Sequence, residues 1–337
     1  MPSKSLSLLL FLALTVTGIA TAEPDPASEV PTVDLRLGLA RSITQPGYLA
    51  RGVGQGGFVE LEKGHVIGAL LPITVADSPS VARAANSDAA YLALRQALTL
   101  SDRFTIGECR RDTRRIAVWF ELEANGELAL APSSVGLWVA RGVRVFSLVG
   151  RRDNALATAA TAFEPGAITG LTEAGRDVVR RVFAAGALLD VSNASDPTID
   201  EVIALAREAH APVIATHANA RALADRPSNL SDSQVRAIAT TGGIIGATAA
   251  YGQLAPGREP TLQHLVRQIT YLIGVAGVEH VALGTGFEAD AGQLRDFRSA
   301  SDLPRLHRAL RQAGLSEHDV ARVMYRNALR VLCPPHP

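Results

Sequence analysis

Short runs of apolar residues alternate with segments of helical periodicity along most of the chain. Eight such runs are present, and most are continuous stretches without strict alternation, as in parallel strands that are buried on both faces. They are Thr32–Leu39, His65–Thr74, Arg115–Ala124, Val143–Val149, Leu188–Asn193, Pro212–Ala218, Gly242–Ala250 and His280–Phe287. We therefore predict eight buried strands that are mainly parallel.

Segments with helical spacing lie between these runs. The predicted helices include Val81–Arg103, Thr172–Ala185, Thr261–Val275 and two helices within Ser301–Leu332. Capping-box patterns at Thr198–Glu201 and Ser231–Gln234 predict two further helix starts, and Ser316 is predicted to cap the last helix. Gly142, Gly186 and Gly277 stand where a helix must stop before the next strand.

Eight strand-then-helix units in one chain indicate a (β/α)₈ barrel, which is an α/β fold of the TIM type. An open doubly wound sheet is the alternative. No Gly-rich nucleotide loop follows the first predicted strand, and the number of units favours the barrel. We find no linker or repeat beyond the strand-helix unit, so residues 32–333 are predicted to form a single domain.

The N-terminus has the composition of a signal peptide. Lys4 precedes an apolar run and then Ala20-Thr21-Ala22, so we expect residues 1–22 to be a signal peptide and residues 23–31 a Pro-rich spacer. The protein is then exported to a periplasm or secreted, with no transmembrane segment in the mature chain. Cys109 and Cys333 form a disulfide or remain two free thiols, and the sequence leaves both open.

Charge and length limit the classes of partner. The 337 residues carry a formal net charge of zero, which gives no electrostatic preference for nucleic acid. With 47% hydrophobic residues the chain can bury a large core. A small ligand, a protein partner or a second copy of the chain stay possible.

Candidate chemistry is sought at the carboxyl ends of the predicted strands, where the reacting groups of a barrel lie. Glu121 and Glu123 share one face of the third strand, and His217 ends the sixth. Together they could bind a metal ion, since carboxylate and imidazole are normal zinc ligands. The structural alternative is an ion pair in which Arg36, on the first strand, neutralises one carboxylate.

Several segments resemble the membrane (renal-type) dipeptidase family of zinc metallopeptidases. They are LTEAGRDVVRRVFAAGALLDVSNASDPTIDEVI, APVIATHANARALADRPSNLSDSQVRAIATTGGIIGATAA, HVALGTGFEAD and YRNALRVL. The resemblance covers nearly all of the expected mature chain. It implies a (β/α)₈ barrel that hydrolyses dipeptides with a binuclear zinc site.

The resemblance also implies that most of the metal ligands are replaced here. Glu123 and His217 fall on retained ligand positions. The other ligand positions carry Arg36, Gly38, Asn193 and Gly286, and two substrate-contacting positions carry Gly150 and Ser228. A guanidinium does not deprotonate, so Arg36 opposes a zinc ion beside it.

Three hypotheses follow from this pattern. The chain is a pseudoenzyme that binds a peptide-like ligand or a partner, or it is an active amide hydrolase with a rebuilt site, or it is a structural module of the cell envelope. In the rebuilt site, Glu121 and either Glu288 or Asp290 would join Glu123 and His217 around one zinc ion. The pseudoenzyme is the hypothesis that the lost ligands favour.

Overall fold

The computed structural model describes residues 30–43, 48, 54–73, 80–109, 115–123, 126–161, 169–254, 259–289 and 294–333. The predicted signal peptide, most of the predicted spacer and Asp290 lie outside these residues. Among the described residues, no helix combines the length and the apolar character needed to cross a bilayer.

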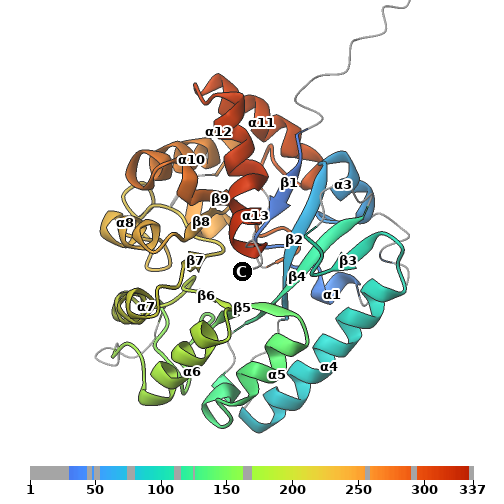
Figure 1. The fold of residues 1–337 in the computed structure, drawn as a ribbon. Coiled ribbons are helices and arrows are strands. Elements are labelled where there is room, and N and C mark those ends of the chain that lie inside the picture. Colours follow the sequence, from blue (N-terminus) through green and yellow to red (C-terminus); the bar gives the residue numbers. More distant parts are fainter. Residues whose placement is uncertain are drawn as a thin grey trace, which may run out of the picture.

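Parallel strands form the centre of the molecule, with helices arranged around them (Figure 1). The strands are β1 Thr32–Asp34, β2 Val66–Ile73, β3 Phe104–Ile106, β4 Ile116–Leu122, β5 Val143–Ser147, β6 Leu188–Asp190, β7 Val213–Ala215, β8 Ile244–Ala247 and β9 Val281–Leu283. They follow the order β2-β1-β9-β8-β7-β6-β5-β4-β3, and a further pairing between β2 and β4 closes the sheet. Eight parallel strands thus form a closed ring, and the predicted (β/α)₈ barrel is confirmed.

Strand β3 is an addition that the apolar runs did not predict. It pairs with the first residues of β4, Ile116–Val118, whereas β5 pairs with Phe120–Leu122 on the same edge of that strand. With only three residues directly after a long helix, β3 has too little pattern to be separated from the helix end.

The strands are shorter than the apolar runs from which they were predicted, because aspartate side chains end two of them. In β1, Asp34 Oδ1 accepts the backbone N–H of Arg36 at 3.0 Å. In β6, Asp190 Oδ1 accepts the N–H of Ser192 at 2.9 Å. Each carboxylate turns the chain away from the sheet within two residues, so Arg36 and Asn193 lie in loops above the barrel. His217 lies in the loop that follows β7.

The helices surround the barrel and close its lower end. They are α1 Ala40–Ile43, α3 Phe58–Lys63, α4 Ser80–Thr99, α5 Ser134–Ala140, α6 Glu173–Ala184, α7 Asp196–Glu208, α8 Asp232–Thr240, α9 Tyr251–Leu254, α10 Leu262–Ala276, α11 Leu303–Gln312, α12 Glu317–Ala321 and α13 Asn327–Leu332. Short 3₁₀ segments occupy Gly126–Ala129, Val278–His280 and Ala300–Asp302, and a π-helical turn, Arg322–Arg326, joins α12 to α13.

Most of the predicted helix caps are present. Ser316 caps α12, and Ser231 and Gln234 form the predicted capping box of α8. Thr172, where the predicted helix Thr172–Ala185 begins, caps α6. The capping box predicted at Thr198 is wrong, because Ser195 caps α7 and Thr198 lies inside its first turn. The carboxylate of Glu201 accepts the N–H of Leu171 at 3.1 Å and so serves the preceding loop.

Apolar side chains fill the lower half of the barrel, by which we mean the half at the amino ends of the strands, and the last helix closes it. Val33, Leu70, Trp119 and Ile214 form one buried cluster with Val331 of α13. Figure 1 shows α13, in red, lying across the barrel next to the strands. Cys333, directly after α13, forms a disulfide with Cys109, which settles the alternative that the sequence left open. The polar loops at the opposite end of the strands are the place for a functional site.

Candidate functional site

The inward face of β4 carries a tryptophan and then two carboxylates. Trp119 belongs to the apolar cluster of the lower barrel, Glu121 is fully buried above it, and Glu123 follows at the barrel mouth. The spacing of two residues puts the three side chains on one face of the strand, as predicted. An apolar floor therefore lies directly beneath two acidic groups.

Arg36 lies against both carboxylates. Its Nη2 donates to Glu123 Oε1 at 2.6 Å, and its Nη1 lies 3.5 Å from Glu121 Oε2. Burial opposes the positive charge of Arg36, but the carboxylates of Glu123 and Glu121 outweigh it and raise the pKa of the guanidinium. The ion pair predicted as the structural alternative is confirmed, and it engages Glu123 most closely.

Glu121 is in an unfavourable environment for a charged group. Burial and the neighbouring Asp190 carboxylate raise its pKa well above the usual value, and Arg36 offsets only part of this effect. Neither of its oxygens accepts a hydrogen bond from the described part of the chain. A buried carboxylate without donors is costly to ionise, so Glu121 favours the neutral acid.

His217 is held by a chain of hydrogen bonds that starts at Asp190. The Thr216 hydroxyl donates to Asp190 Oδ2 at 2.8 Å and lies 2.8 Å from His217 Nδ1. Since that hydroxyl proton is used on Asp190, we assign the imidazole proton to Nδ1, which donates to Thr216 Oγ1. Nε2 is then the acceptor, and it accepts from Asn193 Nδ2 at 3.0 Å.

The charge state of His217 agrees with this arrangement. Burial, Arg36 and Arg151 lower its pKa well below the ordinary value, so the ring is neutral near pH 7. Both of its ring nitrogens have protein partners. The nitrogen lone pair that could bind a metal is engaged by Asn193.

The loop after β9 packs against the exit of β1. A Cβ atom added to Gly38 would lie 2.6 Å from Glu288 C, Glu288 O and Ala289 N. Gly286 has a φ of 78°, a conformation that favours glycine. Positions 38 and 286 are therefore glycine because of backbone geometry.

Glu288 is directed toward the segment after β1. Its carboxylate accepts the N–H of Gly56 at 3.0 Å and the hydroxyl of Ser42 at 2.9 Å. No hydrogen bond or ion pair of Glu288 with Glu121, Glu123 or His217 is present among the described residues. Glu288 is not brought together with the other candidate ligands.

Gly150 and Ser228 lie in loops on the same side of the barrel. Gly150 follows β5 and is half-buried. Ser228 belongs to the loop between β7 and α8, and its carbonyl oxygen lies 3.5 Å from Gln253 Nε2. Both therefore lie near the mouth, and among the contacts of the described residues neither forms a hydrogen bond or ion pair with Arg36.

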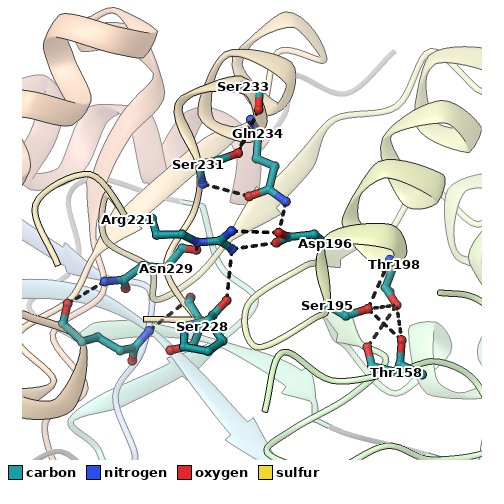
Figure 2. Close-up of polar contacts among 12 residues, drawn as sticks. Thr158, Ser195, Asp196, Thr198, Arg221, Ser228, Asn229, Ser231, Ser233 and Gln234 are labelled. Carbon is teal, nitrogen blue, oxygen red and sulfur yellow. Dashed lines mark hydrogen bonds and ion pairs between the residues drawn. The ribbon is translucent and has the colours of Figure 1, made fainter. Parts of the chain in front are cut away.

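An arginine that the sequence left without a role organises that loop (Figure 2). Arg221 binds both oxygens of Asp196, at 2.8 and 2.6 Å, and its Nε donates to the carbonyl of Asn229 at 2.9 Å. Gln234, from the capping box of α8, donates to Asp196 Oδ1 at 2.9 Å. This bidentate pair between Arg221 and Asp196 ties the loop to the start of α7. The capping-box pattern at Ser231–Gln234 was the only feature of the sequence that pointed to this arrangement.

The residues present do not fit the binuclear zinc site that the family resemblance implies. Among the residues the structure describes, no three His, Cys, Asp or Glu side chains gather in a way that could hold a metal ion. The Glu123 carboxylate is engaged by Arg36 and the free nitrogen of His217 by Asn193. The hypothetical site built from Glu121, Glu123, His217 and Glu288 is not assembled.

Comparisons with known proteins identify a family. A sequence profile described as Membrane dipeptidase (Peptidase family M19) matches residues 28–334. An "Uncharacterized protein in pqqA 5'region" of Klebsiella pneumoniae is 34% identical over 247 residues, which cover 71% of this chain and 88% of that protein. Dipeptidase 3 of Rattus norvegicus is 26% identical over 222 residues, which cover 65% of this chain and 45% of that relative.

Solved structures show the same fold. The probable dipeptidase PvdM from Pseudomonas aeruginosa superimposes with a TM-score of 0.82 at 21% identity, covering 91% of this chain and 95% of that one. A metallo peptidase from Rhodobacter sphaeroides, liganded with a phosphinate mimic of the dipeptide L-Ala-D-Ala, gives 0.77 at 21% identity, with 90% and 99% covered. With its barrel and a family profile that spans residues 28–334, this chain belongs to the membrane dipeptidase family, peptidase family M19.

Proposed function

We propose that this protein is an exported member of the membrane dipeptidase family that does not hydrolyse dipeptides and instead binds a peptide-like ligand or a protein partner at its barrel mouth. The observation that carries the proposal is the position of Arg36, 2.6 Å from Glu123 and 3.5 Å from Glu121. A permanent cation supplies the positive charge that compensates the Glu123 carboxylate.

Electrostatics support the absence of a two-metal reaction. A divalent cation about 4 Å from a guanidinium would be repelled by about 8 kcal/mol at an effective dielectric constant of about 20. Binding a metal through His217 would also require displacing Asn193 from Nε2. A metal ion bound through His217 would therefore have to overcome both a fixed charge and an existing hydrogen bond.

The rebuilt mononuclear site is less well supported. It needs Glu288 beside Glu123 and His217, but Glu288 binds Ser42 and Gly56. It also needs an ionised Glu121, whose pKa burial raises. Neither requirement agrees with the observed contacts.

The disulfide supports the proposal of export. Cys109 and Cys333 are paired, and such bonds persist in the periplasm and outside the cell but are rare in a reducing cytoplasm. N-terminal sequencing of the exported chain tests the predicted cleavage, and a mature protein beginning near Glu23 is expected.

Metal analysis together with a dipeptide assay tests the proposed function. For the full chain purified without chelator, we expect no stoichiometric zinc, no cleavage of dipeptides, and a rise in Tm when a dipeptide such as L-Ala-D-Ala binds. Two zinc ions per chain with dipeptide cleavage would overturn the proposal. One zinc ion, lost in Glu123→Gln or His217→Ala, would favour the mononuclear hydrolase.

The Tm measurement of dipeptide binding needs a control variant at the barrel mouth. Ser228→Ala lies in the loop at the mouth but outside the ion pair, and it is expected to fold like the wild type. If no dipeptide changes the Tm of either protein, the purely structural envelope role is favoured. Light scattering during size-exclusion chromatography tests whether the partner is a second copy of the chain.

A further inference from the structure

The loop after β9 forms a strap, residues Gly286–Ala289, across the exit of β1. The N–H of Gly286 donates to the carbonyl of Arg36 at 3.0 Å, and the N–H of Gly38 donates to the carbonyl of Phe287 at 2.8 Å. The strap therefore binds the backbone on both sides of Leu37. It extends the contact between β1 and β9 beyond the last residues of these strands.

We propose that Glu288 is a latch that locks this strap closed and thereby holds Arg36 in place at the barrel mouth. The inference goes beyond the proposed function and holds whether or not the protein cleaves dipeptides. It assigns a role to a residue that the sequence suggested as a metal ligand.

Three hydrogen bonds fix Glu288 to the segment that follows β1. The carboxylate accepts from Gly56 N–H and from Ser42 Oγ, and the backbone N–H of Glu288 donates to Gln55 Oε1 at 3.0 Å. Gln55 Nε2 in turn donates to the carbonyl of Arg298 at 3.2 Å. The latch thus joins the strap to two other parts of the chain.

Backbone conformation supports a dedicated role for this residue. Glu288 has a φ of 59°, which is uncommon for a residue with a side chain. Such a conformation persists where surrounding contacts hold it. At this position the three hydrogen bonds of Glu288 provide the contacts that hold the backbone.

Close packing beneath the strap makes the closed position specific. The missing side chain of Gly38 leaves room for the backbone of Glu288 and Ala289. A Cβ atom added to Gly56 would lie 3.3 Å from Glu288 Cγ. A carboxylate side chain at position 38 would have no space while the strap is closed. The closed strap and a metal-binding aspartate at position 38 exclude each other.

Hydrogen exchange of backbone amides in Glu288→Ala tests the latch. We expect the amides of Gly38 and Gly286 to exchange about tenfold faster or more than in the wild type, because their acceptors become mobile. The amide of Gly56 should also exchange faster, because its acceptor, the Glu288 carboxylate, is removed. The amide of Val191, bonded to Ile214 on the opposite side of the barrel, is expected to change less than about twofold.

A matched control removes a similar carboxylate elsewhere. Glu201 accepts Leu171 N–H at 3.1 Å and pairs with Arg176 at 2.5 Å, so Glu201→Ala should affect exchange at Leu171 and leave Gly38 unchanged. Glu288→Gly separates the latch from backbone strain, since glycine tolerates the conformation but has no carboxylate. Protection of Gly38 and Gly286 at the wild-type level in both Glu288→Ala and Glu288→Gly would overturn the proposal.

Discussion

The Nη2 atom of Arg36 lies 2.6 Å from Oε1 of Glu123, a residue 87 positions later in the chain. Both side chains are about nine-tenths buried, so the pair is shielded from water. Removing one member of a buried ion pair leaves the other charge without compensation. The pair therefore connects the mouth of the barrel to the stability of the fold.

Arg36→Met should destabilise the protein strongly. We expect a loss of about 3–5 kcal/mol in the free energy of unfolding, because Glu123 would remain buried without its cation. The double variant R36M/E123Q should lose clearly less than the sum of the two single variants. Urea unfolding of all four proteins measures the coupling, and strictly additive losses would show that the two residues do not depend on each other.

Glu121→Gln should stabilise the protein at neutral pH. Burial raises the pKa of Glu121 in the folded state above its unfolded value, so its contribution is most favourable below about pH 4.5 and is lost as the pH rises. Glutamine is neutral at every pH, so the variant removes the cost of ionising this buried group. The Tm of the variant should exceed that of the wild type at pH 8, with the difference vanishing near pH 4.

Asp34 gives the stability a pH dependence of the same sign in the wild type and in Glu121→Gln. Burial raises its pKa to about 6, although hydrogen bonds from Thr285 and Arg36 oppose the rise. Stability from this group is complete below about pH 3.8 and is lost toward pH 6. Because Asp34 is unchanged in Glu121→Gln, comparing the two Tm profiles isolates Glu121. A variant that is less stable than the wild type at pH 8 would contradict the raised pKa.

The sequence predicted the barrel because its signals are local. Continuous apolar runs report burial on both faces of a strand, and the caps at Ser231 and Ser316 each depend on residues three positions apart. The ion pair was also predicted, as the structural alternative to a metal site. Alternation along β4 places Glu121 and Glu123 on one face, and Arg36 follows β1, which only β2 separates from β4 in the barrel.

The remaining features depend on contacts that no local pattern encodes. The strap brings Gly38 against Glu288 from the other end of the chain, and only the folded backbone shows why position 38 has no side chain. The contacts of Glu288 could not be predicted for the same reason, because its partners Ser42, in the four-residue helix α1, and Gly56, in a loop, lie in segments too short for a periodic pattern. The strands were predicted too long because the turns at Asp34 and Asp190 continue the apolar composition of the runs.

Gly38→Ala should be strongly destabilising although alanine is a small residue. Its Cβ would lie 2.6 Å from three backbone atoms, which cannot move as a flexible side chain would. We expect a loss of about 2–4 kcal/mol, as for other overpacking or strain in a buried site. Gly136→Ala is the matched control, because this glycine lies in α5 with nothing within 4 Å of the added atom.

The control should be neutral or stabilising by up to about 1 kcal/mol, since alanine favours a helix over glycine. Chemical denaturation of both variants provides the comparison. Equal effects of the two substitutions would show that the strap does not pack against Gly38 in solution.

The disulfide between Cys109 and Cys333 should hold the last helix against the bottom of the barrel. The bond joins residues 224 positions apart, so it limits the unfolded chain over most of its length. Removing a bond of this kind costs about 2–5 kcal/mol. The double variant Cys109→Ser/Cys333→Ser should therefore melt at a lower temperature than the wild type under oxidising conditions.

Reductant should lower the Tm of the wild type to that of the variant and leave the variant unchanged. Amide exchange should increase most in Asn327–Leu332, because α13 lies next to Cys333 and closes the lower end of the barrel. A Tm that reductant lowers equally in both proteins would show that the cysteines are not paired.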